Sequence, residues 1–307
     1  MTTVLVIRPM QPEDEAFVSC CSHVAESAEI DACAARRRSL FRRLRADGAV
    51  FPVAVLDGDP AGFAYGVPIE RASWGPLGEG MMTLPCLYVM KKAAGVGAGR
   101  RLVEAVVEGA RAERRLAVVT TAYRDLPGAE WFLPAGFFES VGFRAVDERG
   151  REVLLWRPLQ QGASPPRFLE PRYDFEPVPG RVTVDLFWNG FCQTSGIEAE
   201  RVRRVCAEYP ADVVLREYCA EDRPTLPRHQ IPRGIFVDGR EIGWGYEAPE
   251  QGIRDAVEAT LRRDHSNSSG SSADGASRGR TEVRTPNRAH NASNGARSAT
   301  ARGDGHM

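Results

Sequence analysis

Three glycines lie at alternate positions in this chain, at Gly95, Gly97 and Gly99. They separate an apolar segment, residues 81–89, from an amphipathic segment that begins at Arg100. Glycine lets the backbone approach a ligand closely and adopts positive φ without strain. The first turn of a helix has free N–H groups and carries the positive end of the helix dipole. The pattern therefore predicts a strand, a loop and a helix that bind an anionic group, with a pyrophosphate as the first candidate.

The chain has 307 residues, which favours two domains with separate apolar cores. Its 40 basic side chains nearly balance 41 acidic ones, so the overall charge gives no support to a nucleic-acid or anionic-membrane surface. No segment reaches the roughly 18 apolar residues of a membrane helix, and Arg8 and Glu13 come too early for a signal peptide. We therefore expect a cytoplasmic protein that binds neither nucleic acid nor a membrane.

The cysteines do not form a recognisable framework. Cys20 and Cys21 are adjacent, the total of 7 is odd, and the spacings are not those of zinc sites. We expect no metal site and no disulfide framework, and most of the thiols should be buried as small apolar groups. The cysteines stand at positions 20, 21, 33, 86, 192, 206 and 219.

Apolar periodicity predicts a mixed α/β first domain over residues 1–159. An arginine-rich helix is expected around Leu40, and its basic side chains form either a solvated face or a patch that steers an anionic ligand. Further helices are expected after Pro12, over 100–115 and near 131–141. Strands are expected at 4–7, 50–56, 62–69, 81–89, 116–121, 143–146 and 152–159, with a hairpin turn at Asp57-Gly58.

A proline-rich stretch, residues 160–180, predicts a stiff linker and a domain boundary. A second α/β pattern follows over 181–263. It consists of strands at 182–188 and 212–217, helices at 196–209 and 250–262, and a hairpin over Asp238-Gly239. Residues 264–307 contain no Leu, Ile or aromatic residue, so we expect this tail to be disordered.

Several motifs of the first domain resemble the GNAT acyltransferases over residues 4–159. They are Ile7-Arg8-Pro9, Leu87-Tyr88-Val89, the loop Ala94–Gly99 before Arg100, and Phe137-Phe138-Glu-Ser-Val-Gly-Phe143. The antiparallel strand order around the loop and the missing ribose-binding acid argue against a dinucleotide fold. The resemblance implies a mixed sheet with acetyl-CoA as co-substrate.

By this resemblance, the strand before the loop lines the pantetheine of CoA, and N–H groups of the loop and helix hold its pyrophosphate. Two departures weaken the match. Ala94 stands where the family usually has Gln or Arg, and Phe138 stands where a Tyr often serves as general acid. The cofactor-binding residues implied are Leu87, Tyr88, Val89, Gly95, Val96, Gly97, Ala98, Gly99 and Arg100.

The catalytic groups of the first domain are less defined. The proton for the departing CoA thiolate comes either from Tyr123 or directly from solvent. Acetyl transfer needs a neutral amine, hence a base or a water path, and Glu79 is the candidate base with Glu70 behind it. Cys86 is either an active-site thiol or a packed strand residue.

The second domain resembles the thioredoxin fold, with Cys192-x-x-Ser195 in place of Cys-x-x-Cys and Pro232 in place of the cis-proline. A helix N-terminus favours a thiolate, so the resemblance makes Cys192 a candidate nucleophile. Ser195 prevents an internal disulfide. The remaining alternatives are mixed disulfides, docking of a thiol ligand, exchange with Cys206 or Cys219, and an inert scaffold.

This domain order resembles the YoaP-type acetyltransferases. It implies an acetyl-CoA-dependent N-acetyltransferase that acts on a small-molecule amine or aminothiol, with the second domain shaping or presenting the acceptor. A thiol-containing metabolite as acceptor would give both domains one substrate. The alternative is a CoA-sensing or thiol-handling protein with a catalytically weak first domain. Ala94 and Phe138 favour the alternative, and the intact glycine loop favours the enzyme.

Overall fold

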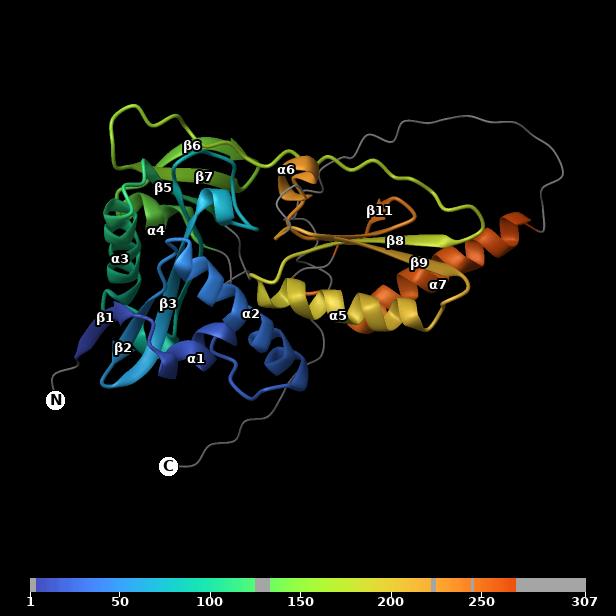
Figure 1. The fold of residues 1–307 in the computed structure, drawn as a ribbon, viewed down its shortest axis with the longest axis horizontal. Helices are drawn as coiled ribbons and strands as arrows, with labels where there is room; N and C mark the ends of the chain where they lie inside the picture. Colours follow the sequence, from blue (N-terminus) through green and yellow to red (C-terminus); the bar gives the residue numbers. More distant parts are fainter. Residues whose placement is uncertain (1–3, 125–132, 222–224, 244–245, 269–307) are drawn as a thin grey trace.

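The computed structural model describes residues 4–124, 133–221, 225–243 and 246–268. Within these residues, seven strands form one sheet in the order β1-β2-β3-β4-β5-β7-β6, and four form a second sheet in the order β11-β10-β8-β9. Figure 1 shows the two sheets, each with its own helices, side by side. We call them the first and second unit. This architecture confirms the predicted fold class, and the predicted disordered tail lies outside the described residues from 269 onward.

The strands of the first unit pair antiparallel with their neighbours, except β4 and β5, which are parallel. The predicted hairpin is formed at Asp57 and Gly58, which both have positive φ, 52° and 98°. The strands are β1 (Leu5–Pro9), β2 (Pro52–Leu56), β3 (Asp59–Pro68), β4 (Met82–Val89), β5 (Ala117–Tyr123), β6 (Arg144–Arg149) and β7 (Glu152–Pro158).

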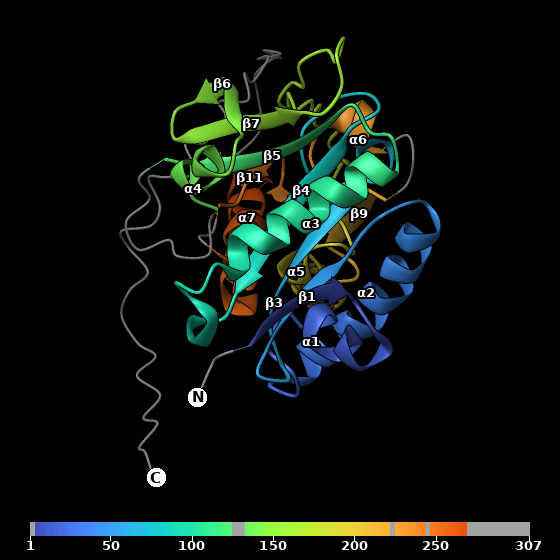
Figure 2. The same ribbon diagram turned by 90° about the vertical axis from the view of Figure 1, so that its left-hand side faces the viewer.

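Helices cover both faces of the first sheet. α3 (Ala98–Ala112) buries Leu102 and Val106 against one face and lies across the strands in Figure 2. α2 (Ala28–Ala46) and the short α1 (Glu15–Ser19) cover the other face, where Phe41 packs against Tyr65. The helix predicted after Pro12 is shorter than expected, because the chain leaves α1 at Cys20 through residues of positive φ. None of the described helices is long and apolar enough to cross a membrane.

The remaining helices of the first unit are short. The helix predicted near 131–141 is α4 (Ala135–Ser140), and residues 131 and 132 lie outside the described part of the chain. Three 3-10 turns complete the unit. They are η1 (Pro12–Asp14), η2 (Ile69–Arg71) and η3 (Lys91–Ala93).

The second unit begins with a β-α-β segment, in which β8 and β9 are parallel, and continues with an antiparallel hairpin beside β8. Its core includes Val184, Leu186 and Val202 from this segment and Ile253 from the last helix. The elements are β8 (Val182–Trp188), α5 (Gln193–Ala207), β9 (Val213–Cys219), α6 (Thr225–His229), β10 (Gly234–Val237), β11 (Arg240–Glu241) and α7 (Glu250–Ser268).

Three expectations for the second unit are corrected. The described residues contain no cis peptide bond, so the peptide before Pro232 is trans. The helix α6 lies in a segment for which the sequence pattern predicted no helix. α7 continues to Ser268, five residues into the segment expected to be disordered, because a helix propagates into polar residues once its first turns are packed.

The two units share an apolar contact. Phe191 follows β8 in the second unit, yet it is only 5% exposed and belongs to the apolar cluster of the first unit. Its ring centroid lies 5.2 Å from that of Tyr65 and 5.8 Å from that of Phe41, both in edge-to-face geometry. A residue of one unit therefore completes the core of the other.

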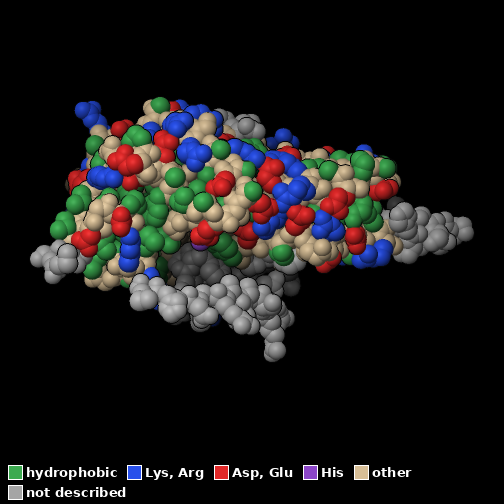
Figure 3. All heavy atoms as spheres, turned by 90° about the horizontal axis from the view of Figure 1, so that it is seen from below, with side chains coloured by type: hydrophobic (Ala, Val, Ile, Leu, Met, Phe, Trp, Pro, Cys, Tyr) green, Lys and Arg blue, Asp and Glu red, His purple; other side chains and the backbone are tan. Residues whose placement is uncertain are grey.

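The arginines of α2 contribute to the same interface. Arg36 pairs with Glu200 of α5, and Arg43, two turns along the same helix face, pairs with Glu221 at 3.1 Å. Arg42 instead pairs with Glu15 of α1 at 2.8 Å. Figure 3 shows basic and acidic side chains intermixed on the lower face of the molecule rather than a basic patch. The predicted alternatives, a solvated face or a ligand-steering patch, omitted this contact between units.

Replacing Phe191 by Ala should weaken the packing between the units. Truncation of a buried Phe typically costs about 3–5 kcal/mol, and the loss should be measured as a lower midpoint in urea unfolding. Val24→Ala is the control, because Val24 is 49% exposed and should change little. An unchanged midpoint for Phe191→Ala would show that this contact does not stabilise the protein.

Candidate functional site

The first sheet opens between β4 and β5. The two strands pair only at Met82↔Val118 and Thr83↔Val119, although they continue to Val89 and Tyr123. Where they part, the hydroxyl of Thr120 donates to the carbonyl of Leu84 at 2.7 Å. Beyond this point β3 still pairs with one edge of β4, while no strand of the described structure pairs with the other edge. A free strand edge of this kind presents N–H and C=O groups to an extended ligand.

A bulge in β4 lies at the same place. In the register with β3, Tyr65 faces Cys86 but Val67 faces Thr83, so β4 carries one extra residue. Pro85, which has no N–H to donate, lies inside this irregularity. It is the sequence signal that would have predicted the bulge, because proline within a central strand is expected only at such a site.

The bulge changes which side chains face each side of the sheet. Before it, Met82 and Leu84 point into the core under α3. After it, Leu87 and Val89 point there, and Tyr88 joins Cys86 on the side covered by α2. With an uninterrupted alternation Cys86 would have pointed toward α3 with Leu84. The bulge thus brings the half-buried Cys86 thiol to the α2 side.

The glycine loop has the geometry that anion binding requires. Gly95 and Gly97 have φ of 78° and 83°, and a Cβ at either position would meet no atom within 4 Å. Gly97 is the N-cap of α3 and no side chain caps it, while the first helical bond runs from the N–H of Arg101 to the carbonyl of Gly97 at 3.1 Å. The N–H groups of Ala98 and Gly99 are thereby directed out of the helix end.

The side chains near the glycine loop supply positive charge and leave the loop exposed to solvent. Ala94 and Val96 are exposed, and Ala94 supplies no hydrogen-bond donor. Arg100 is also exposed, and its guanidinium donates to the carbonyl of Ser140 at 3.3 Å. Phe137 stands 3.3 Å from where a Cβ of Gly99 would lie, so a larger residue at position 99 would press on this ring.

The position expected for a general acid is part of the core. Phe138 is completely buried, and its ring contacts those of Phe137 and Phe143 edge to face at 5.2 and 5.4 Å. Tyr123 lies at the end of β5, beyond the opening, where its hydroxyl is 3.2 Å from a carboxylate oxygen of Glu152. The backbone of Tyr123 also pairs with Leu133 and Pro134, directly before α4, and its catalytic role stays a prediction.

The two candidate bases lie at the other end of β4. Glu79 is exposed and precedes Met82, the first residue of the strand, by three positions. Five residues separate Glu79 from Leu84 at the opening, which is at most about 17 Å of extended chain. Glu70 stabilises the segment before β4, because it accepts the N–H of Gly80 at 2.6 Å and pairs with Arg115 at 3.0 Å. Of the two, Glu79 is the one free of such a structural role.

Arg37 is the charged residue that the sequence analysis missed. It is only 2% exposed, and its guanidinium donates to the hydroxyl of Tyr65 at 3.2 Å, the sulfur of Cys21 at 3.1 Å and the carbonyls of Ser19 and Phe191. All these acceptors are neutral groups. Burial lowers the pKa of Arg37, but the proximity of Cys21, Tyr65 and Cys192 outweighs it and raises that pKa above its ordinary value.

Cys192 lies at the N-cap of α5, half-buried, with its sulfur 3.0 Å from the hydroxyl of Thr194. Ser195, the residue in place of a second cysteine, is buried and accepts the N–H of Asn189 at 3.0 Å. Cys206 is 14 residues further along the same helix, about 20 Å away, and burial raises its pKa to about 12. The predicted exchange between Cys192 and Cys206 is therefore out of reach.

The family comparison concerns the first unit. Residues 17–137 match the model of the Acetyltransferase (GNAT) family, which is less than half of the chain. No curated protein matches the sequence.

Solved structures of low sequence identity cover about half of the chain. A putative GNAT acetyltransferase from Desulfovibrio desulfuricans is 21% identical, with a TM-score of 0.38 over 51% of this chain and 100% of that one. The PaiA N-acetyltransferase from Thermoplasma acidophilum, solved with coenzyme A, is 15% identical, with a TM-score of 0.37 over 50% and 99%. The putative acetyltransferase YncA from Salmonella typhimurium, solved with acetyl-CoA, is 18% identical, with a TM-score of 0.38 over 52% and 97%.

The matched residues include the whole of β4, the glycine loop, α3 and β5. The family predicted from the sequence motifs is thereby confirmed for this part of the chain. Residues 17–137 belong to a GNAT acetyltransferase domain.

Proposed function

We propose that the protein is an acetyl-CoA-dependent N-acetyltransferase that acts on a small-molecule amine. The observation that carries this proposal is the opening between β4 and β5, which runs toward the uncapped first turn of α3. An extended ligand with amide groups along its length and a pyrophosphate at one end matches both features. Acetyl-CoA is such a molecule, and it is the typical co-substrate of the GNAT family.

We call the opening between β4 and β5, together with the glycine loop at its end, the slot proposed for acetyl-CoA. Backbone groups of Leu87, Tyr88 and Val89 would pair with the pantetheine amides, because this edge of β4 has no strand beside it. The N–H groups of the loop and of the first turn of α3 would hold the pyrophosphate, with positive charge from Arg100. These roles apply to Gly95, Val96, Gly97, Ala98, Gly99 and Arg100.

The acyl group would lie near the bulge at Pro85. The amine nitrogen attacks the thioester carbonyl and loses a proton, and the CoA sulfur leaves and gains one. We assign protonation of the sulfur to Tyr123 or to solvent. Because Glu79 is exposed and precedes the opening at Leu84 by five residues, we assign it the end of a water path rather than direct contact with the amine.

The proposal includes a thioredoxin-like second domain, as in the YoaP-type acetyltransferases, with boundaries 1–159, 160–180 and 181–263 for the first domain, the linker and the second domain. Three features support it: the parallel pair β8 and β9 around α5, the antiparallel hairpin of β10 and β11, and Cys192 at the start of α5. The trans peptide before Pro232 is a departure from that fold.

The second unit would shape the acceptor site. Phe191 packs on Tyr65, whose neighbour in the sheet is Cys86 next to the bulge. The acceptor would therefore approach the acyl group along a wall to which the second unit contributes, and an aminothiol would also meet Cys192 there.

A second candidate function is a CoA-sensing or thiol-handling protein with a catalytically weak GNAT domain. It is favoured by Phe138, which fills the general-acid position with a buried ring that has no hydroxyl. The two candidates differ in turnover: the sensor binds acetyl-CoA without releasing CoA when amines are added.

Gly97→Glu should abolish acetyl-CoA binding, because the new carboxylate enters the space reserved for the pyrophosphate. Gly162→Glu is a matched control, since Gly162 has nearly the same φ, 80°, and equally open surroundings in the linker. Calorimetric titration with acetyl-CoA measures the effect. Wild-type affinity in Gly97→Glu would contradict the proposed cradle, and no binding by the wild type would contradict both candidate functions.

Tyr123→Phe should lower kcat by about 10²-fold or more if the hydroxyl protonates the CoA sulfur, without changing the affinity for acetyl-CoA. Tyr209→Phe removes a comparable hydrogen bond, from Tyr209 to Glu258 at 2.8 Å, in the second unit and serves as control. Release of CoA thiol with a panel of amine and aminothiol acceptors gives the rate. Equal rates for both variants would assign the protonation to solvent.

Glu79→Gln should reduce the rate by about 10²-fold at unchanged acetyl-CoA affinity, because the water path loses its proton acceptor. Glu70→Gln provides the contrast: it should lower thermal stability, because Glu70 holds Gly80 and Arg115. An unaltered rate in Glu79→Gln would remove this residue from the mechanism.

A further inference from the structure

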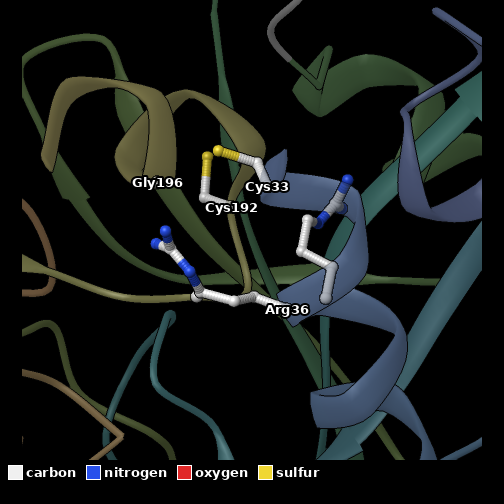
Figure 4. A pocket seen from close by; sticks show the side chains of 6 residues that line it. Cys33, Arg36, Cys192 and Gly196 are labelled. Carbon is white, nitrogen blue, oxygen red and sulfur yellow. The ribbon is translucent and has the colours of Figure 1, made fainter. Parts of the chain in front are cut away.

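Two cysteines from different units face one another at the interface of α2 and α5. Cys33 lies on α2 and Cys192 at the start of α5, and both line one small cavity together with Arg36, Arg37, Gly190 and Gly196. Figure 4 shows the two side chains pointing toward each other with their sulfur atoms adjacent. Both are free thiols. They are 159 positions apart in sequence, so no motif joins them.

Gly196 makes this approach possible. A Cβ at position 196 would lie 3.2 Å from the sulfur of Cys33, tighter than ordinary packing. The N–H of Gly196 also donates to the carbonyl of Cys192 at 3.1 Å, so the two residues occupy the same first turn of α5. The absence of a side chain at Gly196 lets α2 bring Cys33 against the turn that begins at Cys192.

A buried arginine lies beside the pair. Arg37 is buried, and each of its hydrogen-bond acceptors in the described structure is neutral, so no carboxylate among them balances its charge. A buried cation in this state is stabilised by negative charge in its surroundings. The proximity of Cys192 contributes to the raised pKa of Arg37.

The two thiols differ in access. Cys192 is partly exposed, whereas Cys33 is 2% exposed, and burial raises the pKa of its thiol. A reagent from solvent therefore meets Cys192 first. Cys33 is placed to react only with a group already attached at Cys192, which is the division between an attacking and a resolving thiol.

We propose that Cys192 and Cys33 form a dithiol pair between the units that reduces low-molecular-weight disulfides. Cys192 gives its proton to solvent and attacks one sulfur of the disulfide, which breaks the S–S bond and releases a thiolate that takes a proton from solvent to become the first thiol. Cys33 then attacks the sulfur of Cys192 in the mixed disulfide and releases the second thiol, which takes the Cys33 proton. The protein gains the Cys33–Cys192 bond and loses two electrons to the substrate, which leaves as two thiols.

Other thiols are less suited to be the resolving group. Cys206 is about 20 Å away along α5. Cys21 accepts a hydrogen bond from Arg37 at 3.1 Å, which holds its sulfur on the guanidinium. Ser195 replaces the cysteine that would act within the motif, and its hydroxyl is engaged with Asn189. Cys33 is thus the thiol that lines the same cavity as Cys192.

The test uses the full chain, reduced and freed of reductant, with excess hydroxyethyl disulfide. After acid quenching and alkylation, peptide mass spectrometry should find Cys33 linked to Cys192 and little hydroxyethyl adduct. Cys33→Ser should instead retain the adduct on Cys192, and Cys192→Ser should form neither product. Cys206→Ser is the control and should react like the wild type, since it lies outside the pair.

Three results would overturn the proposal: a wild type that keeps the adduct on Cys192 as Cys33→Ser does, a disulfide that joins Cys192 to Cys21 or Cys86, or a Cys192 that reacts only after unfolding. Circular dichroism and thermal melting verify that each variant folds. Cys33→Ala replaces Cys33→Ser where a buried hydroxyl prevents folding, since it removes the sulfur without adding a polar group.

Discussion

The buried guanidinium of Arg37 is the interaction on which the rest of the structure depends. Within the described residues it donates to neutral acceptors from separate segments: the end of α1, the sheet through Tyr65, and the second unit through Phe191. A buried charge is costly unless its hydrogen bonds are satisfied, so removing one of these segments leaves an unsatisfied cation. The helices over the first sheet and the second unit are therefore stabilised together.

This cation also connects the two chemical features of the molecule. The bulge at Pro85 brings Cys86 to the face of the sheet that α2 covers, where Tyr65 binds Arg37. On the far side of the same guanidinium lies the start of α5 with Cys192. Arg37 thus lies between the sheet face that carries Cys86 and the proposed thiol pair.

Local patterns predicted most of the fold, and contacts over long sequence distances were not predictable. The apolar runs of β2 and β3, the turn at Gly58 and the glycines before α3 act through neighbours in sequence, so the sequence specifies them directly. Arg37 looks like its exposed neighbours in a run of arginines, and only the partner surface shows that it is buried. Cys33 is another such case, because its relation to Cys192 depends on how α2 meets α5. Pro85, by contrast, is a local signal in the sequence for the bulge in β4.

Because Phe191 lies in the core of the first unit, the first unit cannot be separated from the second without exposing apolar surface. In a chain that ended in the linker before β8, the apolar surface of Phe41 and Tyr65 that Phe191 covers would be exposed to water. The guanidinium of Arg37 beside it would lose one of its hydrogen-bond acceptors. Such a fragment would tend to associate through that surface. The second unit thus supplies part of the core that stabilises the first.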